Sequence, residues 1–112
     1  MLIYKIIARQ TWHQAESARV FHGAGIDLSD GFIHLSTADQ AETTARLHFA
    51  GQDDLLLVAF KPEDFMSTFK CDASRGGALF PHVYGTIDPS QAQWKKPLLW
   101  DGSAHHFPEG WR

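Results

Sequence analysis

The stretch DGFIHLST, residues 30–37, holds the first side chains that could do chemistry. An Asp-Gly turn leads into a short apolar segment that contains His34 and ends at two hydroxyl residues, Ser36 and Thr37. Side chains alternate along a strand, so His34 and Ser36 would share one face. If a helix begins there, its free amides would suit ribose hydroxyls or a phosphate. From periodicity alone, a histidine that bonds a neighbouring carbonyl, with Ser36 or Thr37 capping the helix, is the more frequent arrangement.

A second histidine motif, FPHVYG, spans residues 80–85. If this segment is a strand, His82 and Tyr84 lie on one face. A histidine and a tyrosine side by side can stack against a flat ring and donate a hydrogen bond to it. A core tyrosine with a satisfied hydroxyl is the alternative interpretation, and it is somewhat more common.

The segment DASRGG, residues 72–77, places Arg75 beside two glycines. The backbone could approach an anion there while the guanidinium pairs with it through two hydrogen bonds. Without other information, a solvated surface turn is favoured. Cys71 could be a nucleophile with His34 or His82 as its base, although a lone buried cysteine is more often a packing residue. The histidines show no HExxH or CxxC spacing, so we expect no metal.

Length, charge and cysteine content limit the class of protein. The chain has 112 residues, which predicts a single domain over residues 1–112. Its net charge of −3 leaves no basic excess for phosphates, so we expect no nucleic-acid partner. One cysteine cannot form an internal disulfide, which fits a reducing compartment. No apolar run approaches the roughly 20 residues that span a bilayer. We therefore expect a soluble cytoplasmic protein with no membrane partner, and the composition leaves its oligomeric state open.

The elements that must position these residues follow from periodicity and turn signals. Two helices are expected, one after Thr11 and one from Thr37 to about Phe49, where Thr37 and Gln40 can form a capping box. The continuous apolar run Leu55 to Ala59 predicts a central strand covered on both faces. Residues 22–31 and 74–77 are predicted loops, and Phe107 and Trp111 should hold the tail in place. Further strands are expected at 2–8, 32–35, 69–72, 83–87 and, as an edge strand because of Pro97, 94–100. Early helices and late strands indicate an α+β fold.

These segments together resemble an uncharacterised bacterial family, the domain of unknown function number 952. The resemblance covers nearly the whole chain. It rests on residues 3–6 (IYKI), Trp12, the DGFIHLST segment with Gln40 after it, residues 54–57 (DLLL) and the FPHVYG motif. It implies the ADP-ribosylation fold of NAD-dependent ADP-ribosyltransferases, with split, strongly bent sheets and two main helices in the N-terminal half.

The resemblance also implies roles for the residues above. A histidine followed closely by Ser or Thr holds the adenosine ribose in such enzymes, and His34 with Ser36 resembles this pair. Aromatic side chains sandwich the nicotinamide ring, for which Tyr84, with Phe80, is the best match. Asp72 stands where the family usually carries a catalytic Glu. Its carboxylate would be drawn back by one methylene, and a misplacement of about 1 Å can cost on the order of 100-fold in rate.

The lead hypothesis is thus a small enzyme or binding protein for NAD, as a substrate, or for an ADP-ribose-like nucleotide. The catalytic candidates are Asp72 and His34, and the ligand-binding candidates are Ser36, Thr37, Arg75, Phe80, His82 and Tyr84. A non-catalytic module that binds a small ligand or a protein partner is the alternative from another class. A thiol enzyme that uses Cys71 is a third. Convergence of His34, Ser36, His82 and Tyr84 on one cleft would favour the first hypothesis.

Overall fold

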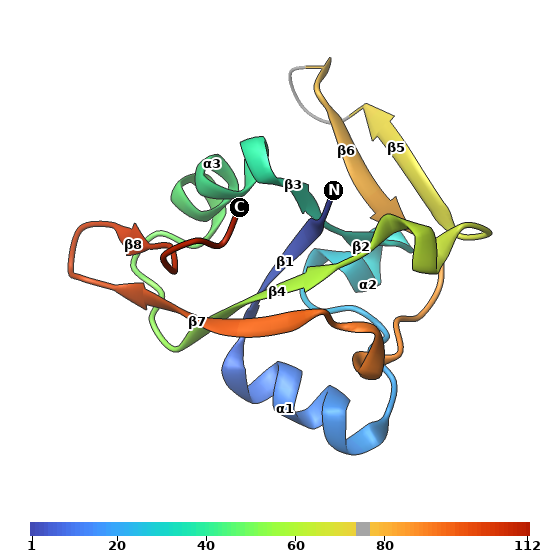
Figure 1. The fold of residues 1–112 in the computed structure, drawn as a ribbon, viewed down its shortest axis with the longest axis horizontal. Coiled ribbons are helices and arrows are strands. Elements are labelled where there is room, and N and C mark those ends of the chain that lie inside the picture. Colours follow the sequence, from blue (N-terminus) through green and yellow to red (C-terminus); the bar gives the residue numbers. More distant parts are fainter. Residues whose placement is uncertain (74–76) are drawn as a thin grey trace.

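The computed structural model describes residues 1–73 and 77–112 (Figure 1). The predicted anion site at Arg75, and most of the predicted turn at 74–77, lie outside the described residues. The elements in chain order are β1 (Ile3–Ala8), α1 (Arg9–Ala18), α2 (Ile26–Asp30), β2 (Ile33–His34), β3 (Ser36–Thr37), α3 (Ala38–His48), β4 (Leu55–Phe60), the 3-10 helix η1 (Pro62–Phe65), β5 (Phe69–Ala73), β6 (Leu79–Val83), the 3-10 helix η3 (Pro89–Gln91), β7 (Trp94–Trp100) and β8 (His105–His106).

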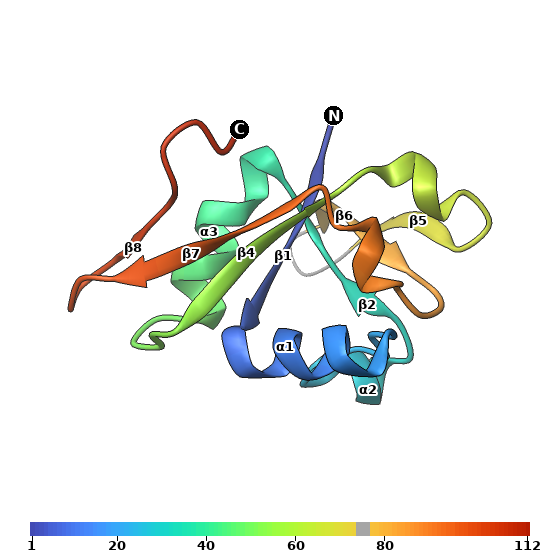
Figure 2. The same cartoon turned by 60° about the horizontal axis from the view of Figure 1, so that its bottom comes forward.

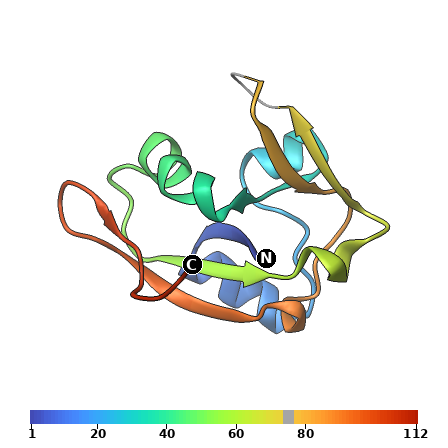
Figure 3. The same ribbon diagram turned by 45° about the horizontal axis from the view of Figure 1, so that its top comes forward.

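The strands form two antiparallel sheets. The larger has the order β3-β1-β4-β7-β8, and the smaller has the order β2-β6-β5. Figure 3 shows α1 and α3 on opposite faces of the larger sheet, while the β5–β6 hairpin extends away from it. The described part of the chain is therefore an α+β structure with two main helices and curled antiparallel sheets, as the sequence predicted.

Strand β4 explains why the larger sheet needs a helix on each face. All six of its residues are buried. Leu56, Val58 and Phe60 pack into one core with Trp12 of α1. Leu55, Leu57 and Ala59 pack into the other core, which contains Ala41 and Ala45 of α3. The prediction of a central strand covered on both faces is confirmed.

The chain passes from the smaller to the larger sheet directly after the short strand β2, which lies within the segment expected as a strand over 32–35. His34 belongs to β2, in the smaller sheet, whereas Ser36 belongs to β3, which pairs with β1. Leu35 lies at the crossing, and its amide donates to the carbonyl of Pro81 at 3.0 Å. In Figure 2 the chain can be followed from β2 along β1 into α3. That helix begins with the predicted capping box of Thr37 and Gln40.

Two predictions about local structure are wrong. No strand covers 83–87: β6 ends at Val83, and Ile87 makes only an isolated bridge to Phe21. Pro81 lies inside the strand instead of preceding it. The missing N–H of Pro81 costs little because β2 ends at His34 and so needs no donor from the proline. The predicted loop at 22–31 contains the short helix α2, which begins after Gly25 and ends at Gly31.

None of the helices among residues 1–73 and 77–112 combines the length and the apolar character that crossing a membrane requires.

Candidate functional site

One face of the smaller sheet gathers most of the residues that could do chemistry. His34 of β2 pairs with His82 of β6, which in turn pairs with Lys70 of β5. Because side chains alternate along strands, the even-numbered residues share this face. Ile33 and Val83, which are odd-numbered, pack into the core behind it. We call this surface the histidine face; its members are Phe32, His34, Lys70, Asp72, Phe80, His82 and Tyr84.

Aromatic contacts hold the middle of the histidine face together. The His34 and His82 rings meet edge to face with their centroids 5.2 Å apart. The Phe32 ring lies against His34, His82 and Tyr84, at centroid distances of 4.6, 4.4 and 4.9 Å. The two motifs predict that their strands lie in the same or in facing sheets and that both histidines border one pocket, and the pairing of β2 with β6 confirms the first part.

One carboxylate oxygen of Asp72 is hydrogen-bonded by two other side chains of the histidine face. Tyr84 donates its hydroxyl to Asp72 Oδ2 at 2.5 Å, and His82 Nδ1 lies 3.0 Å from the same oxygen. The hydrogen bond from Tyr84, and then that from His82, lower the pKa of Asp72 below its ordinary value. The same bond raises the pKa of Tyr84. Lys70 adds positive charge, with Nζ 5.5 Å from the centroid of the Tyr84 ring. At neutral pH the histidine face therefore presents an ionised carboxylate beside a neutral phenol.

His34 is held from behind by a buried carboxylate. Its Nδ1 lies 2.6 Å from Asp27 Oδ1, and its backbone N–H donates to the same oxygen at 3.0 Å. The Asp27 side chain is only 1% exposed. On the outer side, His34 Nε2 lies 3.0 Å from Oδ2 of Asp30. The ring thus stands between an inner and an outer carboxylate, both contributed by α2.

The inner carboxylate is itself paired with a buried cation. Lys5 Nζ donates to Asp27 Oδ2 at 2.8 Å and to the carbonyl oxygen of His34 at 2.9 Å. The amide of Ala24 also donates to Oδ2, at 3.0 Å. Burial acts to raise the pKa of Asp27, but the charge and hydrogen bond of Lys5, with the bonds from Ala24 and His34, lower it overall. Asp27 is consequently ionised and surrounded by donors.

The loop before α2 needs glycine to bring Asp27 into this position. Gly23 has a φ of +112°, and a Cβ atom at this position would lie 2.7 Å from Asp27 Cβ. A larger residue would push Asp27 away from the amide of Ala24. The loop and α2 thus present a carboxylate on each side of His34.

Other predicted site residues lie apart from the histidine face. Ser36 is buried in β3 with its Oγ 3.0 Å from Thr44 Oγ1, and Thr37 caps α3. Cys71 is exposed and alternates with Lys70 and Asp72, so it points to the opposite side of β5. The interpretation of Cys71 as a buried packing residue is therefore wrong. Phe80 lies on the histidine face across from Asp72.

Sequence reasoning missed five residues of this site: Lys5, Asp27, Asp30, Phe32 and Lys70. One signal was present, since Lys5 interrupts an apolar strand, and a lysine buried in a sheet requires a carboxylate partner. Phe32 could have been found from its alternation with His34. The spacing of Asp30 and His34 carried no such signal, because α2 was expected to be a loop.

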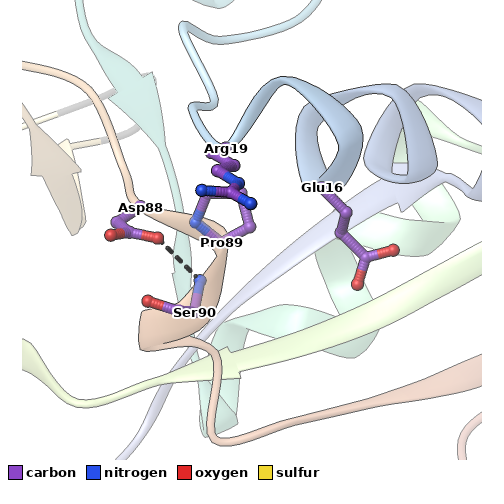
Figure 4. Close-up of a pocket in the computed structure, with 5 residues that line it drawn as sticks. All are labelled: Glu16, Arg19, Asp88, Pro89 and Ser90. Atoms are coloured by element: carbon purple, nitrogen blue, oxygen red, sulfur yellow. Dashed lines mark hydrogen bonds between the residues drawn. The ribbon is translucent and has the colours of Figure 1, made fainter.

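Two hollows lie elsewhere on the described structure. One, of about 410 Å³, is bordered by Glu16, Arg19, Asp88, Pro89 and Ser90 (Figure 4). The other, of about 390 Å³, is bordered by residues that include Tyr4, Thr37 and Arg112. Neither is bordered by a residue of the histidine face, so the partly exposed His34 and the buried His82 meet on one side of the smaller sheet and not in either hollow. Within the described ranges, no three His, Cys, Asp or Glu side chains are grouped as metal ligands.

Together these features define a small α+β protein with a candidate ligand site on a three-stranded antiparallel sheet. Residues 6–95 match the family described as "Protein of unknown function (DUF952)", and the chain belongs to this family. A comparison with curated proteins gave no match.

Solved structures of one relative have the same fold. The crystal structure of protein CC0527 from Caulobacter crescentus is 41% identical with a TM-score of 0.90, over 95% of this chain and 94% of that one. The solution NMR structure of the same protein is 42% identical with a TM-score of 0.83, over 93% and 90% of the two chains. Both come from structural genomics.

Proposed function

We propose that this protein has an ADP-ribosylation-type fold and binds NAD or an ADP-ribose-like nucleotide on the histidine face, where it cleaves or transfers the ADP-ribosyl group. The observation that carries this proposal is the position of Asp72. Its ionised carboxylate lies 3.0 Å from His82 and within hydrogen-bonding distance of Tyr84, and the His82 ring in turn meets the ring of His34.

The chemistry required is the stabilisation of a sugar cation. When the bond between the ribose and nicotinamide breaks, nicotinamide leaves with the bonding electron pair and positive charge develops on the ribosyl carbon. A fixed carboxylate stabilises that charge in the transition state. Asp72 would supply it, and water or an acceptor hydroxyl would then attack the same carbon and lose its proton to solvent.

Binding would use the rings around Asp72. Tyr84 is 41% exposed, so a flat base or nicotinamide ring can stack on it. His34 would hold a ribose hydroxyl, and Lys70 would attract the pyrophosphate. In this proposal Ser36 does not contact the ligand, and its hydroxyl instead forms a hydrogen bond with Thr44 inside the protein. A role for Arg75 in holding a phosphate stays a prediction.

A non-catalytic module for a small ligand is the second candidate, and one observation favours it. Both nitrogens of His34 already face carboxylates of the protein itself, at 2.6 and 3.0 Å. Asp72 Oδ2 is likewise occupied by Tyr84 and His82. Groups held this firmly are suited to recognition, and catalysis would require some of these contacts to open.

Calorimetry with NAD and with ADP-ribose, at millimolar concentration, tests the binding. His34→Gln should weaken binding by about 2- to 13-fold, the value of one neutral hydrogen bond. The matched control is His22→Gln, because His22 is exposed in the loop after α1. Absence of heat with both nucleotides on the parent protein would exclude the nucleotide proposal and leave the non-catalytic module.

A second measurement separates catalysis from binding. Release of nicotinamide from NAD should be abolished in Asp72→Asn, while ADP-ribose still binds. Binding of NAD by the parent protein without any release of nicotinamide would favour the non-catalytic module.

A further inference from the structure

A buried ion pair lies next to His34, a member of the histidine face. Lys5, in β1 of the larger sheet, and Asp27, in α2, are joined at 2.8 Å, with side chains 10% and 1% exposed. Three contacts from this pair reach His34. Asp27 Oδ1 bonds both its backbone N–H and its ring Nδ1, and Lys5 bonds its carbonyl oxygen. The pair therefore holds both the backbone and the ring of one residue.

The division of bonds on Asp27 decides where the proton of the His34 ring lies. Oδ2 is occupied by Lys5 and the amide of Ala24, so Oδ1 is the oxygen that faces the ring. An ionised carboxylate only accepts hydrogen bonds. His34 Nδ1 must therefore donate, and in the neutral ring Nε2 is left with its lone pair.

Asp30 is not suited to stay opposite that lone pair. Its carboxylate lies 3.0 Å from Nε2 and also only accepts. Its side chain is 47% exposed, so it can turn into solvent. A ligand that offers a donor can then take its place, whereas a ligand that offers an acceptor meets the same conflict as Asp30.

We propose that Lys5 and Asp27 are positioning residues that keep the proton of neutral His34 on Nδ1, so that Nε2 accepts a hydrogen bond from a hydroxyl of the ligand. The structure thereby assigns the ligand class of this nitrogen: a donor such as a sugar hydroxyl, in the place where Asp30 lies. The proposed function enters this inference at one point, where the hydroxyl is identified as that of a ribose.

Nitrogen-15 NMR of the ring tests the inference without any ligand. Spectra are recorded at about pH 9, well above the ordinary histidine pKa of about 6.5, and the His34 signals are assigned by their loss in His34→Gln. The parent protein should show the Nδ1-protonated tautomer. Asp27→Asn should shift the ring toward the Nε2-protonated tautomer, because the amide of Asn can donate to Nδ1. The matched control Asp30→Asn should keep the proton on Nδ1.

An Nε2-protonated ring in the parent protein would overturn the inference. So would a tautomer that follows Asp30→Asn and ignores Asp27→Asn. If Asp27→Asn does not fold, the tautomers of the parent protein and of Asp30→Asn test the inference, and both should carry the proton on Nδ1. In calorimetry, Asp27→Asn should also lose about 2- to 13-fold in ADP-ribose affinity. If the parent protein binds no nucleotide, the proposed function fails, while the tautomer result still decides whether Asp27 positions His34.

Discussion

His34 and His82 are direct partners in the pairing of β2 with β6, and each ring has a carboxylate at Nδ1. The two carboxylates come from different places: Asp27 from the helix α2, and Asp72 from the strand β5. The two imidazoles are thus oriented by separate carboxylates and meet edge to face. The site therefore depends on long-range packing as much as on the motifs that contain the histidines.

Removing the cation behind His34 should destabilise the protein strongly. Lys5→Met keeps most of the side-chain volume but leaves Asp27 as a buried charge without its partner. Breaking a buried pair in this way typically costs about 3–5 kcal/mol. Urea melts of Lys95→Met supply the matched control, because Lys95 pairs with Glu16 at 2.6 Å on the surface. That change should cost less than about 1 kcal/mol, and equal losses in the two variants would contradict the buried role of Lys5.

The ion pair of Lys5 and Asp27 should also affect how the free energy of unfolding changes at acid pH. The pKa of Asp27 is lowered in the folded protein. Its contribution to stability is therefore complete above the unfolded pKa of about 3.9 and is lost as the pH falls through the lower folded value. Denaturant melts at about pH 6 and about pH 3 should show a smaller loss of stability in Asp27→Asn than in the parent protein. A loss of the same size in both would show that Asp27 does not contribute.

The bond between Tyr84 and Asp72 should be measurable by NMR. Tyr84→Phe removes the largest influence that lowers the pKa of Asp72, so the carboxyl carbon of Asp72 should titrate at a higher pH. Tyr4→Phe is the control, because the Tyr4 hydroxyl bonds the carbonyl of Trp111 instead. If Asp72 titrates unchanged in Tyr84→Phe, the bond does not persist in solution.

Gly23 should tolerate no side chain. In Gly23→Ala the new Cβ would meet Asp27 Cβ at 2.7 Å, in addition to the strain of a positive φ. We expect a loss of roughly 1–3 kcal/mol from the strained backbone and a further loss from displacement of Asp27. Gly102→Ala separates backbone strain from the steric clash, because Gly102 has a φ of +102° but an added Cβ would have no heavy atom within 4 Å. Thermal melts should show the larger loss for Gly23→Ala, and the reverse order would remove the steric argument.

The parts of the fold that follow from local sequence were predictable. Strand β4 reads as a continuous apolar run, and α3 begins at a capping box. The position of the strand that contains His82 does not follow from local sequence, because a proline is typical of a strand boundary, whereas the short length of β2 lets Pro81 lie inside β6. The meeting of His34 and His82 was predicted from the motifs. Asp27 was not, since its partners Lys5 and His34 are brought to it by tertiary folding and not by spacing along the chain.

The crossing at Leu35 has a consequence for cooperativity. The β5–β6 hairpin projects from the body of the molecule in Figure 1, and β2 pairs with it over only two residues. Among the residues of the hairpin that the structure describes, two further hydrogen bonds reach it, from the Leu35 amide to Pro81 and from the Gln40 side chain to Leu79. Few hydrogen bonds join it to the rest of the molecule, and its opening must also break the packing of Val83 in the core and of Phe32 against His82. We expect the hairpin to open as a unit below the free energy of global unfolding. In native-state hydrogen exchange the Leu35 amide would report this opening, and the Val58 amide in the middle of β4 would exchange only when the whole chain unfolds.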